Sequence, residues 1–114
     1  MASGIKTVIY PVKDLVQAKT LYRALVGAEP FADEAYYVGF MVGDQQIGLD
    51  PQGHSQGMTG PVPYWHVDDL QESLKGLLDA GAEPQREVSD LGGGKLMASV
   101  KDADGNIIGL IESP

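Results

Sequence analysis

The second half of this chain repeats the first, and the duplication constrains the fold more than any single residue does. Short segments recur in the same order and at nearly the same interval. The recurring pairs are Val12-Lys13-Asp14-Leu15 with Val67-Asp68-Asp69-Leu70, Gly27-Ala28-Glu29-Pro30 with Gly81-Ala82-Glu83-Pro84, and Ile47-Gly48-Leu49 with Ile108-Gly109-Leu110. Ordered matches of this kind indicate one supersecondary unit that is used twice.

The length of the chain limits the number of domains that the two modules can form. With 114 residues, of which 43 % are hydrophobic, the chain suits one domain with a modest core. Each module would be marginal alone, so we expect the two to share a core or to pair across a dimer. The Gly/Ser/Gln-rich stretch that follows Gln52 has the composition of a linker. We expect one domain over 1–114, with module one at 1–52, the linker at 53–60 and module two at 61–114.

Each module has the pattern of one strand, one helix and three further strands, which predicts an α+β fold of two tandem βαβββ modules. Asp14 and Asp69 are the expected helix N-caps, and Gly27 and Gly81 follow the helices. The expected apolar face of the first helix is Leu15, Ala18, Leu21, Tyr22 and Leu25. The expected strands lie at 6–12, near 31, at 36–42 and 45–49 in one module, and at 62–67, near 87–88, at 96–101 and 106–111 in the other.

The charge of the chain narrows the classes of partner. Lysine and arginine number 8 against 16 acidic residues, and the formal net charge is −8. This balance disfavours nucleic acids and anionic membranes, which bind basic clusters. The absence of cysteine excludes disulfides and thiolate metal sites. With no apolar run of membrane-spanning length and no signal-peptide pattern, we expect a cytoplasmic protein.

The paired pattern resembles the vicinal oxygen chelate superfamily, which holds glyoxalase I, extradiol dioxygenases, methylmalonyl-CoA epimerase and the fosfomycin- and bleomycin-resistance proteins. The resemblance covers almost the whole chain. It rests on Val12-Lys13-Asp14-Leu15, Leu21-Tyr22-Arg23 and Asp102-Ala103-Asp104-Gly105-Asn106, the last with Ala103 in place of the family's usual proline. The resemblance implies that the two modules form a half-open, mixed β-barrel-like cleft. It also implies a homodimer, which would cover open sheet edges.

Metal-dependent members of that superfamily hold a divalent ion at four equivalent points, in the first and last strand of each module. Carried over by the motifs, the first-strand points fall on Thr7 and Val62, and the last-strand points on Gly48 and Gly109. Valine and glycine offer no donor atom, and a lone threonine hydroxyl is a poor ligand for zinc or iron. We therefore expect no metal site and no cofactor.

Strand alternation predicts which other side chains line the cleft. The expected ligand-binding residues are Thr7, Ile9, Pro11, Gln46, Gly48, Asp50, Val62, Tyr64, His66, Ile107 and Gly109. The two glycines either leave room for a ligand to approach the backbone or fit a tightly curved strand. Tyr36, Tyr37, Phe40 and Met41 alternate across one strand, so one set is core and the other is cleft or dimer surface. His54 and Met58 lie in the linker and could cover the cleft, although a solvated linker is the simpler expectation.

His66 is the most reactive candidate, because a histidine can act as acid or base near neutral pH. It can equally donate a hydrogen bond to a ligand or be structural. Tyr64 would supply a stacking face and a hydroxyl, and Asp50 could orient His66. Trp65 points to the opposite face by alternation, which favours a core role.

Three functions fit these residues. The first is a metal-independent small-molecule binder of the bleomycin-resistance type, which sequesters an aromatic or amphipathic ligand, such as a drug or antibiotic, in an apolar cleft with a few polar groups. The second is a metal-independent isomerase, lyase or cyclase that uses His66 as its general base. The third is an accessory module that binds a protein partner.

Overall fold

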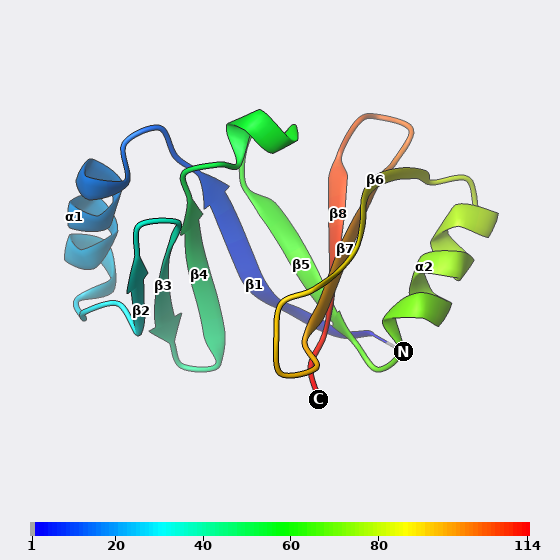
Figure 1. Ribbon diagram of the computed structural model, residues 1–114, viewed down its shortest axis with the longest axis horizontal. Coiled ribbons are helices and arrows are strands. Elements are labelled where there is room, and N and C mark those ends of the chain that lie inside the picture. The colour runs from blue at the N-terminus through cyan, green and yellow to red at the C-terminus, as the bar shows by residue number, and fades with distance from the viewer. Residues whose placement is uncertain (1) are drawn as a thin grey trace. The chain divides into compact units, whose positions relative to one another are not determined.

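The computed structural model describes residues 2–114, which divide into two compact units. The N-unit is Lys6–Val62, and the C-unit is Pro63–Pro114 together with the N-terminal residues up to Ile5. Each unit has the element order βαβββ, and Figure 1 shows one helix beside the strands of each. The predicted α+β fold of two βαβββ modules is confirmed.

The N-unit contains a four-stranded sheet with one helix. Its elements are the part of β1 (Ala2–Pro11) from Lys6 onward, α1 (Leu15–Val26), β2 (Ala32–Glu34), β3 (Tyr37–Val42) and β4 (Gln45–Asp50). The strand order is β2-β3-β4-β1. Strand β1 pairs with β4 in parallel, and the other two pairs are antiparallel. A helical crossover is what a parallel pair requires, and α1 lies in that connection.

The C-unit repeats this arrangement. Its elements are β5 (Val62–Val67), α2 (Leu70–Asp79), β6 (Glu83–Asp90), β7 (Leu96–Lys101) and β8 (Ile107–Glu112), in the order β5-β8-β7-β6. Strand β5 pairs with β8 in parallel, and Tyr64 lies opposite Gly109. In the N-unit Ile9 lies opposite Gly48 in the corresponding pair. The register of the duplication therefore matches between the two units.

The helices begin where their capping residues place them. The Asp14 carboxylate accepts a hydrogen bond from the Gln17 N–H at 3.0 Å, and the Asp69 carboxylate accepts one from the Glu72 N–H at 3.1 Å. These bonds satisfy amides that have no partner within the first helical turn. Gly27 ends α1 at φ 77°, a left-handed conformation that glycine adopts without strain. The predictions for Asp14, Asp69 and Gly27 are confirmed, whereas the C-cap of α2 is Ala80 and Gly81 is the residue after it.

Helix α1 buries only part of its predicted apolar face, because the prediction holds for Leu15, Ala18 and Tyr22 but not for Leu21 and Leu25. Leu15, Ala18, Tyr22 and Val26 pack against the buried Val38, Phe40 and Leu49 of the sheet. Leu21 and Leu25 remain 66 % and 78 % exposed, so their predicted core role is wrong. Residues 18, 22 and 26 form one i, i+4 row, and residues 21 and 25 form the neighbouring row. Apolar content alone did not distinguish the two rows.

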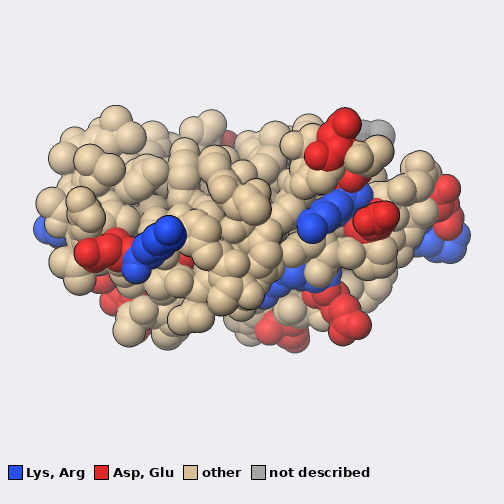
Figure 2. Space-filling model, turned by 90° about the horizontal axis from the view of Figure 1, so that it is seen from above, with Lys and Arg blue, Asp and Glu red and all other residues tan. Residues whose placement is uncertain are grey.

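The C-unit core lies between α2 and its sheet. Val67, Leu70, Ala98 and Leu110 form the buried cluster, and Leu74 and Leu77 of α2 pack against it. Among residues 2–114, no helix is long and apolar enough to cross a membrane. On the face drawn in Figure 2, lysine and arginine side chains lie beside acidic ones, and no broad basic surface is seen among the residues described.

The segment predicted as a linker is partly folded back. It contains a short 3-10 helix, η1 (His54–Gln56), and His54 is exposed as expected. Met58, however, is only 4 % exposed, so the expectation of a solvated position is wrong for this residue. Its N–H donates to the Gly53 carbonyl at 3.0 Å, and a Cβ at Gly53 would lie 3.0 Å from the Met58 sulfur. This turn holds the methionine against the start of the segment.

Candidate functional site

Each sheet has one face covered by its helix and one face turned away from it, here called the helix-distal face. In the N-unit, Tyr10, Ile47 and Leu49 pack on the helix side. Side chains alternate along a strand, so the neighbouring residues lie on the helix-distal face. These neighbours pair directly in the β1–β4 register, as Thr7 with Gln46, Ile9 with Gly48 and Pro11 with Asp50. The structure thus places the six predicted N-unit residues on one face.

The C-unit repeats this division. Val67 and Leu110 belong to the helix-side cluster, so Tyr64, His66, Gly109 and Ile111 lie on the helix-distal face. Tyr64 pairs with Gly109, and His66 with Ile111. Val62 at the start of β5 and Ile107 at the start of β8 share this face by alternation. The two predicted sets therefore lie on equivalent faces of their own units.

Both glycines at the predicted last-strand positions, Gly48 and Gly109, lie beneath tyrosine rings. A Cβ at Gly48 would come within 2.8 Å of Cε1 and 2.9 Å of Cζ of Tyr37. A Cβ at Gly109 would come within 2.6 Å of Cγ and of Cε1 of Tyr64. The sequence left two interpretations of these glycines open, a ligand or a curved strand. The structure gives another reason, because a tyrosine of the same unit fills each space.

Tyr37 is the residue that sequence reasoning did not assign. Its hydroxyl accepts a hydrogen bond from the Gln46 amide, with 2.9 Å between Nε2 and Oη. Burial raises the pKa of Tyr37, the Gln46 hydrogen bond lowers it in part, and the nearby Asp50 carboxylate raises it further. The net direction is upward, so Tyr37 keeps its proton well into the alkaline range.

The side chains of β3 divide between the helix side and the helix-distal face of the N-unit sheet. Phe40 is fully buried on the helix side with Val38, whereas Tyr37 and Met41 lie on the helix-distal face. Tyr36 precedes the strand and is 70 % exposed. The pairing of Gly39 with Gly48 brings Tyr37 diagonally across from Gly48. The position of Tyr37 beside Gly48 follows from the register of the β3–β4 hairpin, which could not be predicted from the sequence alone.

His66 and Asp50 each have partners within their own unit. The His66 carbonyl accepts a hydrogen bond from the Ser3 hydroxyl at 3.3 Å. The Asp50 carboxylate accepts the Gln52 N–H at 2.8 Å, which closes the turn after β4. The two residues belong to different units, and the orientation of His66 by Asp50 stays a prediction. Trp65 lies on the helix side as predicted, but it is partly exposed rather than a core residue.

The side chains at the four positions predicted to correspond to the superfamily's metal ligands do not fit a divalent metal. Gly48 and Gly109 carry no donor, and tyrosine rings occupy the space above them. Val62 carries none either, and Thr7 offers one buried hydroxyl. Within residues 2–114, no group of three or more His, Asp or Glu side chains is arranged to hold a metal ion. No chemistry through a metal is therefore derived at these positions.

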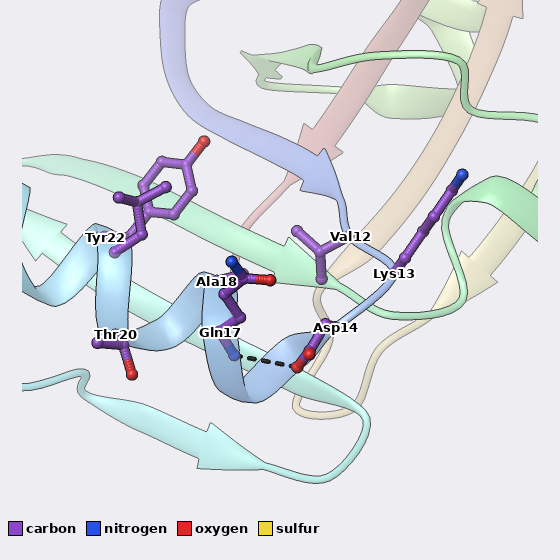
Figure 3. Close-up of a pocket in the computed structure, with 8 residues that line it drawn as sticks. Val12, Lys13, Asp14, Gln17, Ala18, Thr20 and Tyr22 are labelled. Carbon is purple, nitrogen blue, oxygen red and sulfur yellow. Dashed lines mark hydrogen bonds between the residues drawn. The ribbon is translucent and has the colours of Figure 1, made fainter.

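A groove lies on the helix side of each unit. In the N-unit a groove of about 650 Å³ lies beside the start of α1, lined by Val12, Lys13, Asp14, Gln17, Ala18, Thr20, Leu21 and Tyr22. Figure 3 shows the Asp14 cap bond to Gln17 at its edge. In the C-unit a groove of about 440 Å³ is lined by Ala2, Trp65, Val67, Ser73, Gly76, Leu77, Ile108 and Leu110. Both grooves involve the helix side, not the helix-distal face.

Solved structures share this fold, although neither a protein-family model nor a curated protein matches the sequence. Methylmalonyl-CoA epimerase from Mycobacterium tuberculosis matches 99 % of this chain and 89 % of its own at 20 % identity and a TM-score of 0.77. A glyoxalase/bleomycin resistance protein/dioxygenase superfamily member from Vibrio splendidus 12B01 matches 99 % of this chain and 100 % of its own at 11 % identity and a TM-score of 0.73.

A third similar structure is the Mn(II)-bound glyoxalase from Novosphingobium aromaticivorans. It covers 97 % of this chain, which spans 39 % of that longer one, at 20 % identity and a TM-score of 0.71. At these identities the similarity concerns the fold. The chain has the fold of the glyoxalase/bleomycin resistance/dioxygenase superfamily, as its duplicated sequence pattern predicts.

Proposed function

We propose that this protein is a metal-independent small-molecule-binding protein of the glyoxalase/bleomycin-resistance type, which holds its ligand on the helix-distal faces. The observation that carries the proposal is the packing of Tyr37 over Gly48 and of Tyr64 over Gly109. The half-buried Tyr37 ring provides apolar contact surface at the first point, and the buried Tyr64 ring fills the second, where a metal centre would need carboxylate or imidazole donors. Sequestration needs such a surface and a few fixed polar groups, and it needs no reaction centre.

The expected ligand is aromatic or amphipathic, and drug or antibiotic sequestration is the role that we propose for it. The half-buried Tyr37 ring favours a ligand with a flat apolar part. Gln46 and Asp50 add polar groups on the same N-unit face. The net charge of −8 favours neutral or cationic ligands over anionic ones.

Calorimetric titration with a panel of aromatic and amphipathic compounds, including antibiotics, tests this function. Each titration is run with EDTA and again with added zinc or manganese. We expect micromolar binding that is equal under both conditions. A ligand that binds only when the metal is present would contradict the proposal, and so would the absence of any binding below millimolar concentration.

A second function follows from His66, which shares the helix-distal face of the C-unit with Tyr64. Acid–base catalysis of an isomerase, lyase or cyclase reaction on a bound ligand would use this imidazole. His66→Ala should then abolish turnover of any ligand found in the panel while thermal unfolding stays cooperative. Unchanged turnover would remove His66 from that role.

The homodimer also stays a prediction, which light scattering of the purified protein tests.

A further inference from the structure

We propose, on the basis of the binding function above, that the Tyr37 hydroxyl is the polar contact of the N-unit face and that it recognises a neutral carbonyl-type oxygen. Amides, ketones, esters, lactones and quinones carry such an oxygen. The hydroxyl stands where the side chain of residue 48 would stand, because Gly48 leaves that space to the Tyr37 ring. A tyrosine from β3 thus provides a polar group at a position where β4 has none.

The hydrogen bonds of Tyr37 leave its proton available to a ligand. The Gln46 Nε2 donates to Tyr37 Oη and uses one of its acceptor sites. Among the described residues, no group accepts the phenolic hydrogen. Gln46 holds the hydroxyl in place, and the Tyr37 side chain is half-buried rather than sealed in the interior. The Tyr37 hydroxyl can therefore donate its hydrogen to a ligand, and an oxygen acceptor suits it.

The charge around Tyr37 selects among oxygen acceptors. Asp50 acts on Tyr37 electrostatically from the same face, and no lysine or arginine is among the groups that shift its pKa. A ligand carboxylate at the hydroxyl would place a second negative charge near Asp50, which is unfavourable. A neutral carbonyl accepts the same hydrogen bond without that repulsion. The raised pKa of Tyr37 keeps the donor protonated at neutral pH.

Tyr64 provides an internal contrast to Tyr37. It covers Gly109 with the base of its ring and is only 2 % exposed. A side chain this buried packs the interior of the C-unit and offers little surface to a ligand. The recognition role therefore falls on Tyr37 and leaves Tyr64 as a packing residue.

The test uses three probes of similar size on the full chain, namely toluene, benzamide and benzoate. Amide chemical shifts from nuclear magnetic resonance titrations give the affinity and show whether the perturbed residues lie on the helix-distal face or beside the helices. We expect toluene and benzamide to perturb β3 and β4, and benzoate to bind at least fivefold more weakly than benzamide. Tyr37→Phe should weaken benzamide about fivefold to tenfold, the loss of one hydrogen bond, and change toluene binding less than twofold.

Tyr36→Phe is the matched control, because Tyr36 is exposed and outside the strand. It should leave all three affinities unchanged. If toluene and benzamide bind this face but Tyr37→Phe affects both or neither, the role of Tyr37 is wrong while the binding function stands. Equal binding of benzoate and benzamide would overturn the neutral-oxygen preference. If neither toluene nor benzamide perturbs the helix-distal face, the binding function itself fails.

Discussion

The N-unit and the C-unit fill the same space above equivalent glycines with tyrosines from different strands. Over Gly48 lies the outer end of Tyr37, which comes from β3 and is half-buried. Over Gly109 lies the inner part of the Tyr64 ring, which comes from β5 and is buried. The duplicated fold thus keeps a half-buried tyrosine in one unit and a buried tyrosine in the other. Equivalent backbone positions do not imply equivalent surfaces.

The helix sides of the two units differ as well. In the N-unit, Tyr10 and Tyr22 lie with their ring centroids 5.1 Å apart. Counted from the capping aspartates, the corresponding C-unit residues are Trp65 and Leu77, which line an open groove. Gly76 of α2 stands in the place of Leu21 of α1, and a Cβ at Gly76 would meet no atom within 4 Å. At these positions the C-unit has a tryptophan and a leucine in place of the tyrosine pair, and both units have a groove on their helix side.

The largest expected difference between the units concerns their cores at equivalent positions of β3 and β7. Phe40 and Val100 are both fully buried, opposite Ile47 and Ile108 respectively. Phe40→Ala should lower the free energy of unfolding by about 3–5 kcal/mol, whereas Val100→Ala should lower it by roughly 2 kcal/mol, because it removes less volume. Urea unfolding followed by fluorescence and circular dichroism measures both. Equal losses would contradict the difference in core volume.

The next effect separates the two tyrosine–glycine pairs. Gly109→Ala pushes a methyl group against the base of a buried ring and should cost about 1–3 kcal/mol. Gly48→Ala meets the outer end of a half-buried side chain, which can move, so we expect a cost below about 1 kcal/mol. Thermal unfolding of the two variants and of the Gly48→Ala/Tyr37→Ala double variant compares them. If Gly48→Ala lowered the free energy of unfolding more than Gly109→Ala, the predicted difference between the two units would be wrong.

The free space beside Gly76 predicts a stabilising substitution. Gly76 lies inside α2 and has space for a Cβ, so Gly76→Ala should raise the free energy of unfolding by about 0.5–1 kcal/mol. Gly81→Ala is the matched control, because Gly81 has φ 111° and an alanine there is strained. It should be destabilising. Thermal unfolding of both variants checks the pair, and destabilisation by Gly76→Ala would indicate that the glycine is needed for packing.

The smallest effect concerns alkaline pH. The pKa of Tyr37 is raised in the folded chain by burial and by Asp50, with partial opposition from Gln46. Above the usual tyrosine pKa of about 10, an unfolded chain loses this proton before the folded chain does, so the free energy of unfolding falls as pH rises towards the folded-state pKa. Tyr37→Phe should make that decline shallower. The exposed Tyr36→Phe should not, as urea titrations between pH 9 and about 11 would show.

The features that depend on local sequence patterns, namely the modules, the helix starts and the strand faces, could be predicted from the sequence. The duplication located both βαβββ modules, and Asp14 and Asp69 located the helix starts. Strand alternation divided β1 and β4 correctly into helix-side and helix-distal residues. The same rule placed Trp65 on the helix side, although its predicted burial was wrong. Local rules therefore predicted direction better than burial.

Tertiary packing determined the features that the sequence did not predict. The ring of Tyr37 covers Gly48 across a hairpin, so it depends on register and rotamer together. The choice between Tyr22 and Leu21 as the packed residue depends on how α1 is rotated on its sheet. Met58 is buried because its segment turns back at Gly53. None of these follows from composition or periodicity within one element.

Strand β1 is divided between the two units, and this division has a consequence for how the chain folds. The N-unit is formed by one uninterrupted stretch, whereas the C-unit needs the first few residues of the chain and its last fifty-odd at once. Contacts so far apart in sequence form slowly, because a long loop must close first. We therefore expect the N-unit to become protected from hydrogen exchange first during synthesis or refolding. The start of β1, with Ser3 bonded to the His66 carbonyl, should acquire protection only when the C-terminal strands arrive.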